Sequence, residues 1–215
     1  MSSDFIPALR FNALTRFYDP VVRITTRERR VKHALVEAAA VPEGATVLDV
    51  GCGTGTMTIW LKQQHPNARV IGLDADPGIL AIARRKAERA SVDVEFIEAN
   101  AADIPLSENS VERVVSSLFF HHLLLDQKAE VLGEIFRVLA PDGELHISDW
   151  GEPSNPLMRA AFFFVQILDG FATTRDSVEG RLPGLVEAAG AQPVSYTHLR
   201  AHETSSMISY AVFCL

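Results

Sequence analysis

LDVGCGTGT, the stretch from Leu48 to Thr56, joins a short apolar run directly to three glycines at every second position. The run that leads into it, residues 45–50, is apolar and β-branched and stops at glycine, which predicts a buried strand. Glycine adopts positive φ readily and lets a ligand approach the backbone closely. A strand, a glycine-rich turn and a helix in this order are typical of a nucleotide site, although dinucleotide-binding enzymes share the pattern.

Strand-like and helix-like segments alternate along the rest of the chain. We expect strands at 68–74, 92–99, 111–120 and 143–150, and helices at 55–65, 76–90 and 128–139. Such alternation predicts a Rossmann-like, doubly wound α/β domain with a mainly parallel sheet and helices on both faces. Helical spacing over residues 31–41 predicts a helical N-terminal cap within residues 1–42, and the main domain is expected over 43–193.

Length and charge exclude several classes of protein. The 215 residues suffice for one domain with a sizeable core, and the net charge of −7 argues against a nucleic-acid partner. Two cysteines are too few for a disulfide framework. The N-terminal sequence lacks a signal core, and no apolar run reaches the roughly 18 residues of a membrane span. We therefore expect a cytoplasmic protein without stable membrane insertion, and the oligomeric state stays open.

Two carboxylates narrow the choice of nucleotide. Asp49 lies inside the glycine motif, where it would repel a pyrophosphate and attract a cationic group. Asp74, at the end of the second predicted strand, can accept hydrogen bonds from both hydroxyls of a ribose. S-adenosylmethionine has a ribose, an ammonium group and no phosphate, so it fits both positions. An NAD(P)-dependent reductase is the alternative that Asp49 disfavours.

Five stretches in order carry a resemblance to a known family: VLDVGCGTG, GLDADPGIL, EANAADIPL, VVSSLFFHHL and RVLAPDGELHISDW. They resemble the motifs of class I S-adenosylmethionine-dependent methyltransferases, above all the small-molecule branch that includes the quinone-biosynthesis C-methyltransferases. The resemblance covers roughly residues 12–194 and implies methyl transfer to a small, apolar or aromatic acceptor. The alternative from another class is a non-catalytic protein that binds S-adenosylmethionine or S-adenosylhomocysteine.

The resemblance also implies which residues hold the cofactor. The glycine turn would cradle the methionine part, Asp49 would face its ammonium group and Asp74 would bind the ribose. Asn100 stands where the family usually has Asp beside the adenine, and Ser117 would lie close to the sulfonium. The whole set implied at the cofactor is Tyr18, Asp49, Gly51, Cys52, Gly53, Gly55, Asp74, Ala75, Asn100, Ala101 and Ser117. We expect Cys52 to act only as a small residue that fills the turn.

Methyl transfer needs little chemistry from the protein beyond orientation and exclusion of water, because the methyl group is already activated on sulfur. A base is required only when the acceptor is a hydroxyl or a carbon acid. His121 and His122 are the candidates for such a catalytic base, because they follow the strand whose end faces the cofactor. The structural alternative is that one histidine packs against a helix while the other points to solvent. No histidine or cysteine spacing predicts a metal site.

The stretch NPLMRAAFFFVQILDGF, residues 155–171, is the most apolar part of the chain. It is too short to span a bilayer. Three interpretations stay open: a helix that faces the core, loose docking to a membrane, or a lid over the acceptor pocket at about residues 155–175. Insertions at this point commonly shape the acceptor pocket in the family that the chain resembles.

The end of the chain departs from the family pattern. Residues 194–204 read VSYTHLRAHET, which a transposase-type sequencing adapter encodes in one frame, and residues 208–215 match a primer string in that frame. Segment 194–215 therefore resembles translated adapter, and we predict a non-native tail; a genuine final hairpin is the alternative. Its β-rich part is expected to dock as the last strand. We expect Tyr210, Phe213 and Cys214 to pack poorly against the helices.

Overall fold

The computed structural model describes residues 28–150, 179–190, 192–198 and 208–214. These residues form a sheet of seven strands in the order β3-β2-β1-β4-β5-β7-β6. The strands β1 to β5 run parallel, and β7 lies antiparallel between β5 and β6. Their bounds are β1 Thr46–Val50, β2 Arg69–Asp74, β3 Glu95–Glu98, β4 Val111–Ser117, β5 Leu139–Trp150, β6 Gln192–His198 and β7 Ile208–Cys214.

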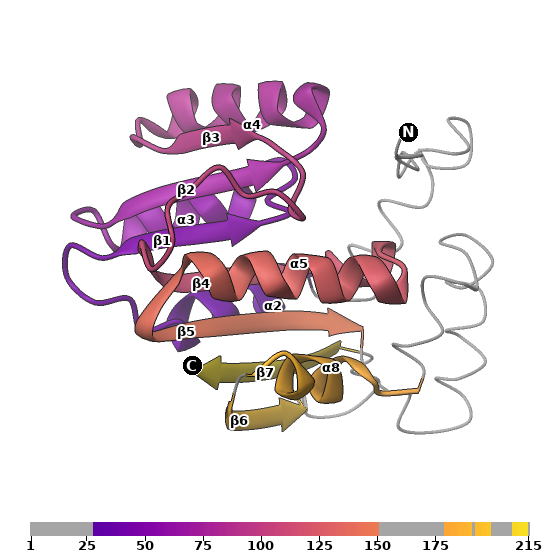
Figure 1. Cartoon of the computed structure of the whole chain (residues 1–215). Coiled ribbons are helices and arrows are strands. Elements are labelled where there is room, and N and C mark those ends of the chain that lie inside the picture. Colours follow the sequence, from indigo (N-terminus) through magenta and orange to yellow (C-terminus); the bar gives the residue numbers. More distant parts are fainter. Residues whose placement is uncertain (1–27, 151–178, 191, 199–207, 215) are drawn as a thin grey trace.

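Helices cover both faces of this sheet, as the alternation of segments predicts. In Figure 1, α5 and α8 lie in front of the sheet and α2 and α3 lie behind it. Each face has its own cluster of buried apolar side chains, one around Leu132 and Ile135 of α5 and one around Leu35 of α2 and Leu61 of α3. The bounds are α2 Glu28–Ala38, α3 Thr56–Gln64, α4 Pro77–Ala90, the short 3-10 helix η1 Phe120–His122, α5 Leu125–Val138 and α8 Leu182–Ala188.

The start of α4 follows from its first residues. The Asp76 carboxylate accepts hydrogen bonds from the backbone N–H groups of Gly78 and Ile79, and Pro77 occupies the first helical position. The cap satisfies donors that have no partner within the helix, and proline is pre-organised there. The helix ends at Ser91, whose φ of 53° is left-handed. This sequence signal therefore predicts the element to within a residue.

Some predicted boundaries are wrong by a few residues. Strand β4 ends at Ser117, and helix α5 begins at Leu125, because the Gln127 side chain accepts the backbone N–H of Leu124 and caps the helix earlier. Strand β5 begins at Leu139, so the APDG stretch lies within it. Asp142 there has a φ of 65°, and the register with β4 shifts at the same place, which is the mark of a bulge.

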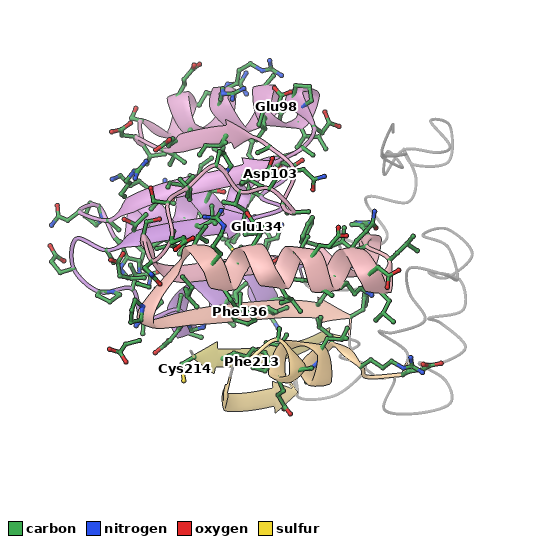
Figure 2. The ribbon with its side chains drawn as sticks, viewed as in Figure 1. Glu98, Asp103, Glu134, Phe136, Phe213 and Cys214 are labelled. Carbon is green, nitrogen blue, oxygen red and sulfur yellow. The ribbon has the colours of Figure 1, made fainter. Side chains whose placement is uncertain are left out.

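The tail docks on the sheet as predicted, but its packing differs from the expectation. Strand β7 pairs with β5 from Cys214 opposite Glu144 to Ile208 opposite Trp150. The prediction that Phe213 packs poorly is wrong: it is 1% exposed within the core. Phe213 is the register partner of the core residue Leu145, and a core position of this kind accepts any apolar side chain of about the right size. Figure 2 shows Phe213 on the side of the sheet that α5 covers.

Several predictions concern parts that the structure leaves out. Tyr18, most of the N-terminal cap (residues 1–27) and the apolar stretch expected as a lid at 155–175 lie outside the described residues, as does the side chain of Tyr210. Among the helices that are described, none has the length and apolar character that a membrane crossing requires.

Candidate functional site

The glycine-rich turn between β1 and α3 is built on three left-handed glycines. Gly51, Gly53 and Gly55 have φ angles of 70°, 55° and 69°. The backbone N–H groups of Gly51 and Cys52 both donate to the carbonyl of Leu73 on β2, at 2.9 and 3.0 Å. The turn is therefore fastened to the neighbouring strand at the carboxyl ends of the parallel strands, where open α/β sheets bind ligands.

The three glycines serve two different purposes. A Cβ at Gly51 would lie 2.3 Å from Cδ2 of Phe119, and one at Gly55 would lie 2.9 Å from both Ala83 and Phe96. At Gly53 a Cβ would meet nothing within 4 Å. Gly51 and Gly55 thus make room for side chains of the protein itself, whereas Gly53 leaves its backbone open to a ligand.

Asp74, at the end of β2, connects the turn to the next helix. Its Oδ2 accepts the N–H of Gly53 at 2.9 Å, and its Oδ1 accepts the N–H of Asp76 at 3.0 Å. Each carboxylate oxygen can accept a second hydrogen bond. Asp74 therefore orients the open part of the turn and keeps acceptor capacity for the two hydroxyls of a ribose.

Asp49 is a buried carboxyl group, and only one of its two oxygens has a hydrogen-bond partner. It is 1% exposed, and its Oδ2 accepts the Thr58 hydroxyl at 2.7 Å, while its Oδ1 has no hydrogen-bond partner in the structure. Burial raises the pKa of Asp49 to about 6; nearby Asp74 adds to this, whereas the Thr58 hydrogen bond and the charge of Lys32 oppose it. A buried acceptor without a partner is costly, so an ammonium group of a ligand fits this oxygen.

Two serine hydroxyls extend this group of unpartnered atoms. Ser117 at the end of β4 and Ser148 on β5 are register partners, and both hydroxyls are buried without a hydrogen-bond partner. Asp49 pairs with Val115, two residues before Ser117, so alternation places all three side chains on one face of the sheet. The carboxyl ends of β1, β4 and β5 thus present polar atoms that a ligand can satisfy.

The remaining residues implied at the cofactor follow β2 and β3 or lie in the turn. Ala75 is exposed and Ala101 is buried, while the exposed Asn100 accepts the Ala102 N–H through Oδ1 at 3.0 Å. That oxygen keeps one lone pair for a ligand. Cys52 is buried, and burial together with Asp49 and Asp74 raises the pKa of its thiol. The thiol therefore stays neutral and fills the turn, as expected.

Lys86, a residue not anticipated from the sequence, holds the glycine turn from the outside. Lys86 on α4 donates to the carbonyl of Thr54 at 2.9 Å and to the hydroxyls of Thr54 and Thr56 at 3.1 and 2.6 Å. Because Lys86 is about thirty residues away in the chain, no local pattern indicates this contact. The lysine fixes the start of α3 next to the open backbone at Gly53.

The two histidines after β4 have different surroundings. His121 is 5% exposed, and its Nδ1 lies 2.7 Å from Oδ1 of Asp149 on β5. His122 is exposed, and its ring centroid lies 4.0 Å from that of His121. Desolvation and the neighbouring His121 lower the pKa of His122 to about 4, and the charge of Asp149 opposes them.

This arrangement agrees in part with the structural alternative, because one histidine is buried and the other exposed. The buried ring also pairs with a carboxylate, which that alternative did not include. Asp149, the partner, was missed by the sequence analysis. Within the described ranges, no group of three or more His, Cys, Asp or Glu side chains could hold a metal ion.

Comparison with known proteins gives a consistent result. A family model described as a methyltransferase domain matches residues 47–143. A demethylmenaquinone methyltransferase of Thermus thermophilus is 36% identical over 153 residues, which cover 71% of this chain and 66% of that protein. Another of the same name, from Deinococcus radiodurans, is 28% identical and covers 85% of this chain and 77% of its own length. The match to the first relative thus spans just under two thirds of its length.

Solved structures show the same fold at lower identity. A S-adenosylmethionine-dependent methyltransferase from Aquifex aeolicus superimposes with a TM-score of 0.62 at 21% identity, covering 93% of this chain and 95% of that one. A structure described as a putative O-methyltransferase from Nostoc punctiforme gives a TM-score of 0.72 at 19% identity, covering 93% and 58%. At these identities the likeness shows the fold, and the predicted Rossmann-like class is confirmed.

Proposed function

Because this chain belongs to the class I S-adenosylmethionine-dependent methyltransferases, we propose that it transfers the methyl group of S-adenosylmethionine to a small acceptor of the quinone class. The cofactor supplies a methyl group that is already activated as part of a sulfonium. The protein therefore has to bind the cofactor, orient the acceptor and exclude water.

The observation that carries the proposal is the unpartnered Oδ1 of Asp49 beside the open backbone of Gly53. A buried carboxylate at this place favours a ligand that brings a positive charge, and it disfavours the pyrophosphate of a dinucleotide. The methionine part would lie along the glycine turn, with its ammonium group toward Asp49 and its sulfonium side toward Ser117. The ribose would bind Asp74.

The adenine is proposed to lie beyond β2 and β3, near the loops that follow these strands. Ala75, Asn100 and Ala101 occupy those loops and would contact the base there. Tyr18 is proposed to help close the site over the cofactor. This arrangement keeps every residue of the implied set in its expected role, with Cys52 as filler.

The acceptor class comes from the relatives, which are named for demethylmenaquinone. The ring carbon of a quinone is electron-poor, whereas that of the corresponding hydroquinone is electron-rich and able to attack a methyl group. The proposed acceptor is therefore an aromatic hydroquinone with an apolar substituent. The apolar stretch expected at 155–175 would cover it as a lid, and a cytoplasmic location is part of the same proposal.

The test has two steps. Isothermal titration calorimetry compares S-adenosylmethionine with NADH, and we expect binding of the first only. Release of S-adenosylhomocysteine is then measured with a demethylmenaquinol that carries a single prenyl group. Binding without release for this acceptor and for simple phenols would support a non-catalytic binding protein, and binding of NADH alone would overturn the proposed cofactor.

A further inference from the structure

The Asp149 carboxylate is the centre of a buried hydrogen-bond network at the end of β5. It is 3% exposed and accepts the backbone N–H groups of Phe119, His121 and Trp150 at 3.1, 3.3 and 2.7 Å. Its fourth partner is the Nδ1 atom of His121, at 2.7 Å. Burial alone would raise the pKa of Asp149, but His121 and the backbone donors hold it below the usual value, so the group stays ionised.

An ionised carboxylate at this distance determines which nitrogen of His121 carries the proton. Asp149 can only accept, so Nδ1 must donate, and in the neutral ring the lone pair then lies on Nε2. The indole of Trp150 lies edge-on to the ring, with centroids 6.1 Å apart, and further restricts its orientation. The ring is thus held as a base with one defined accepting atom, which is the role that a carboxylate partner gives histidine in catalytic triads.

The position of this pair links it to the reaction. His121 lies four residues after Ser117, the last residue of β4. The backbone N–H of Phe119 donates to Asp149, and the Phe119 side chain lies against Gly51, so the pair is connected to the glycine turn. Ligands of open α/β sheets bind at these strand ends. Within the part of the chain that the structure describes, Asp149 bonds to the ring of His121, whereas the exposed ring of His122 makes no such bond to a carboxylate.

We infer that His121 is the base that accepts a proton from the acceptor during methyl transfer, and that Asp149 is the positioning residue that holds it in the reactive tautomer. This inference rests on the proposed function. It requires an acceptor with an ionisable hydroxyl, such as a phenol or hydroquinone.

In the proposed step the hydroxyl proton of the acceptor passes to Nε2 of His121. The electron pair left on the acceptor forms the new bond to the methyl carbon, and the pair of the broken methyl–sulfur bond stays on sulfur. When the attacking atom is a ring carbon, its own proton then moves to the oxygen and restores the hydroxyl. The products are the methylated acceptor, S-adenosylhomocysteine and the proton on His121, which solvent removes.

The experiment compares His121→Gln and Asp149→Asn with the matched control His33→Gln, an exposed histidine of α2 that stacks on Trp60. Each variant is examined in the full chain for S-adenosylmethionine affinity by calorimetry and for turnover of the single-prenyl demethylmenaquinol. We expect turnover to fall by about 100-fold or more in the first two variants, with cofactor affinity unchanged within roughly twofold, and to stay within about threefold in the control. The double variant should be no slower than either single one, because the two residues act as a unit.

Two readouts separate a positioning role from a merely structural one. Nitrogen-15 NMR of the histidines in the free protein should show His121 protonated on Nδ1 at neutral pH, with this signal lost in His121→Gln. The titratable groups that the structure places against His121 are Asp149 from β5 and His122 from η1. Because an Asn amide can donate as well as accept, the single Nδ1-protonated form should give way to a mixture of the two tautomers in Asp149→Asn.

The outcomes are distinct. Full turnover in His121→Gln, or a His121 proton on Nε2, would overturn the inference while the proposed methyl transfer survives. Loss of turnover in Asp149→Asn with the His121 proton still on Nδ1 and a lowered melting temperature would show that Asp149 is only a structural residue. If the unaltered chain binds no S-adenosylmethionine, the proposed function itself fails. If it binds the cofactor and methylates only acceptors without an ionisable proton, the base role of His121 is wrong.

Discussion

Asp49 shows how a single residue can favour binding at the expense of folding. Its carboxyl group is buried, and one oxygen lacks a hydrogen-bond partner, so the charged form is disfavoured in the free protein. The raised pKa of about 6 determines in which direction the stability of the protein changes with pH. At pH values between the pKa of the unfolded state, about 4, and that of the folded state, about 6, the folded state binds more protons than the unfolded state. The free energy of unfolding therefore falls as the pH rises through this range, and the loss is complete above pH 6.

Replacement of Asp49 by Asn should therefore stabilise the free protein. We expect the free energy of unfolding at pH 7 to rise by about 1 to 3 kcal/mol, with the gain shrinking as the pH approaches 4. Urea denaturation at both pH values measures this, with the exposed Asp93→Asn as the control. The same variant should bind S-adenosylmethionine more weakly. Equal denaturation midpoints at pH 7 for Asp49→Asn and the unaltered chain would show that the buried charge does not destabilise the folded protein.

The same carboxyl group predicts how cofactor affinity depends on pH. An ammonium group attracts only the ionised form of Asp49, so affinity for S-adenosylmethionine should decline as the pH falls below about 6. Calorimetry between pH 5 and pH 8 tests this, and the decline should disappear in Asp49→Asn. An affinity that is flat across this range in the unaltered chain would remove Asp49 from the ammonium contact.

Asp74 carries the prediction for the ribose. The change Asp74→Ala should weaken S-adenosylmethionine by about 2 kcal/mol or more, roughly 30-fold in Kd, because two hydroxyls lose a charged acceptor and the Gly53 N–H loses its anchor. The control is Glu95→Ala. Glu95 is an exposed acid that pairs with Arg69 and begins β3, whereas Asp74 lies beside Glu98 at the other end of that strand. Unchanged affinity by calorimetry in Asp74→Ala would sink the ribose assignment.

At the scale of one element, the glycine turn is shaped by what surrounds it. Gly51 and Gly53 both need left-handed backbone, but only Gly51 also lies against the Phe119 side chain. The effect of available space can therefore be separated from that of backbone conformation within one turn. The two glycines share the left-handed φ, and only Gly51 is crowded by a side chain.

The matched substitutions Gly51→Ala and Gly53→Ala test this difference. Gly53→Ala should lower the free energy of unfolding by about 1 kcal/mol, from the left-handed φ alone. Gly51→Ala should cost clearly more, about 3 kcal/mol or above, because Phe119 and η1 must move. Denaturant midpoints give both values, and a similar loss in the two variants would show that the ring of Phe119 yields easily. Movement of η1 should also disturb the contact between His121 and Asp149.

At the scale of the whole molecule, the two sides of the sheet differ in how closely their sequences resemble the family. Strands β1 to β5 follow the family motifs, whereas β7 comes from the segment that resembles translated adapter. Strand β7 pairs with the edge of β5 and places Phe213 in the core, and β6 then forms the outer edge of the sheet. The adapter origin of residues 194–215 stays a prediction.

That prediction is tested by comparing this chain with one expressed from the uninterrupted gene. We expect the 215-residue chain to have the lower denaturant midpoint and to associate more readily, because its last strands were not selected for this sheet. The variant Phe213→Ala reports on docking: a loss of about 3 kcal/mol would confirm that β7 is a core strand. Equal stability of the two chains, or genomic reads that encode the same tail, would refute the adapter origin.

The sequence by itself determined the succession along the chain of strands β1 to β5 and helices α2 to α5, the glycine turn and the two acidic positions beside it. These features depend on local signals: the period of apolar residues, the Asp-Pro start of α4, and glycine where the backbone needs positive φ. Each signal acts over a few residues, so a single sequence shows it. The end of β4 and the starts of α5 and β5 were not predicted exactly. The start of α5 depends on a side-chain cap, and the start of β5 lies at a bulge.

Only the tertiary structure decided which polar groups meet. The pairing of His121 with Asp149 joins residues 28 positions apart, and the contact of Lys86 with Thr54 spans 32. Both depend on strand order and on register, and a shift by one residue would turn Asp149 to the other face of the sheet. The unpartnered oxygen of Asp49 is likewise a product of packing, because a carboxylate becomes costly only when the surrounding chain removes it from water.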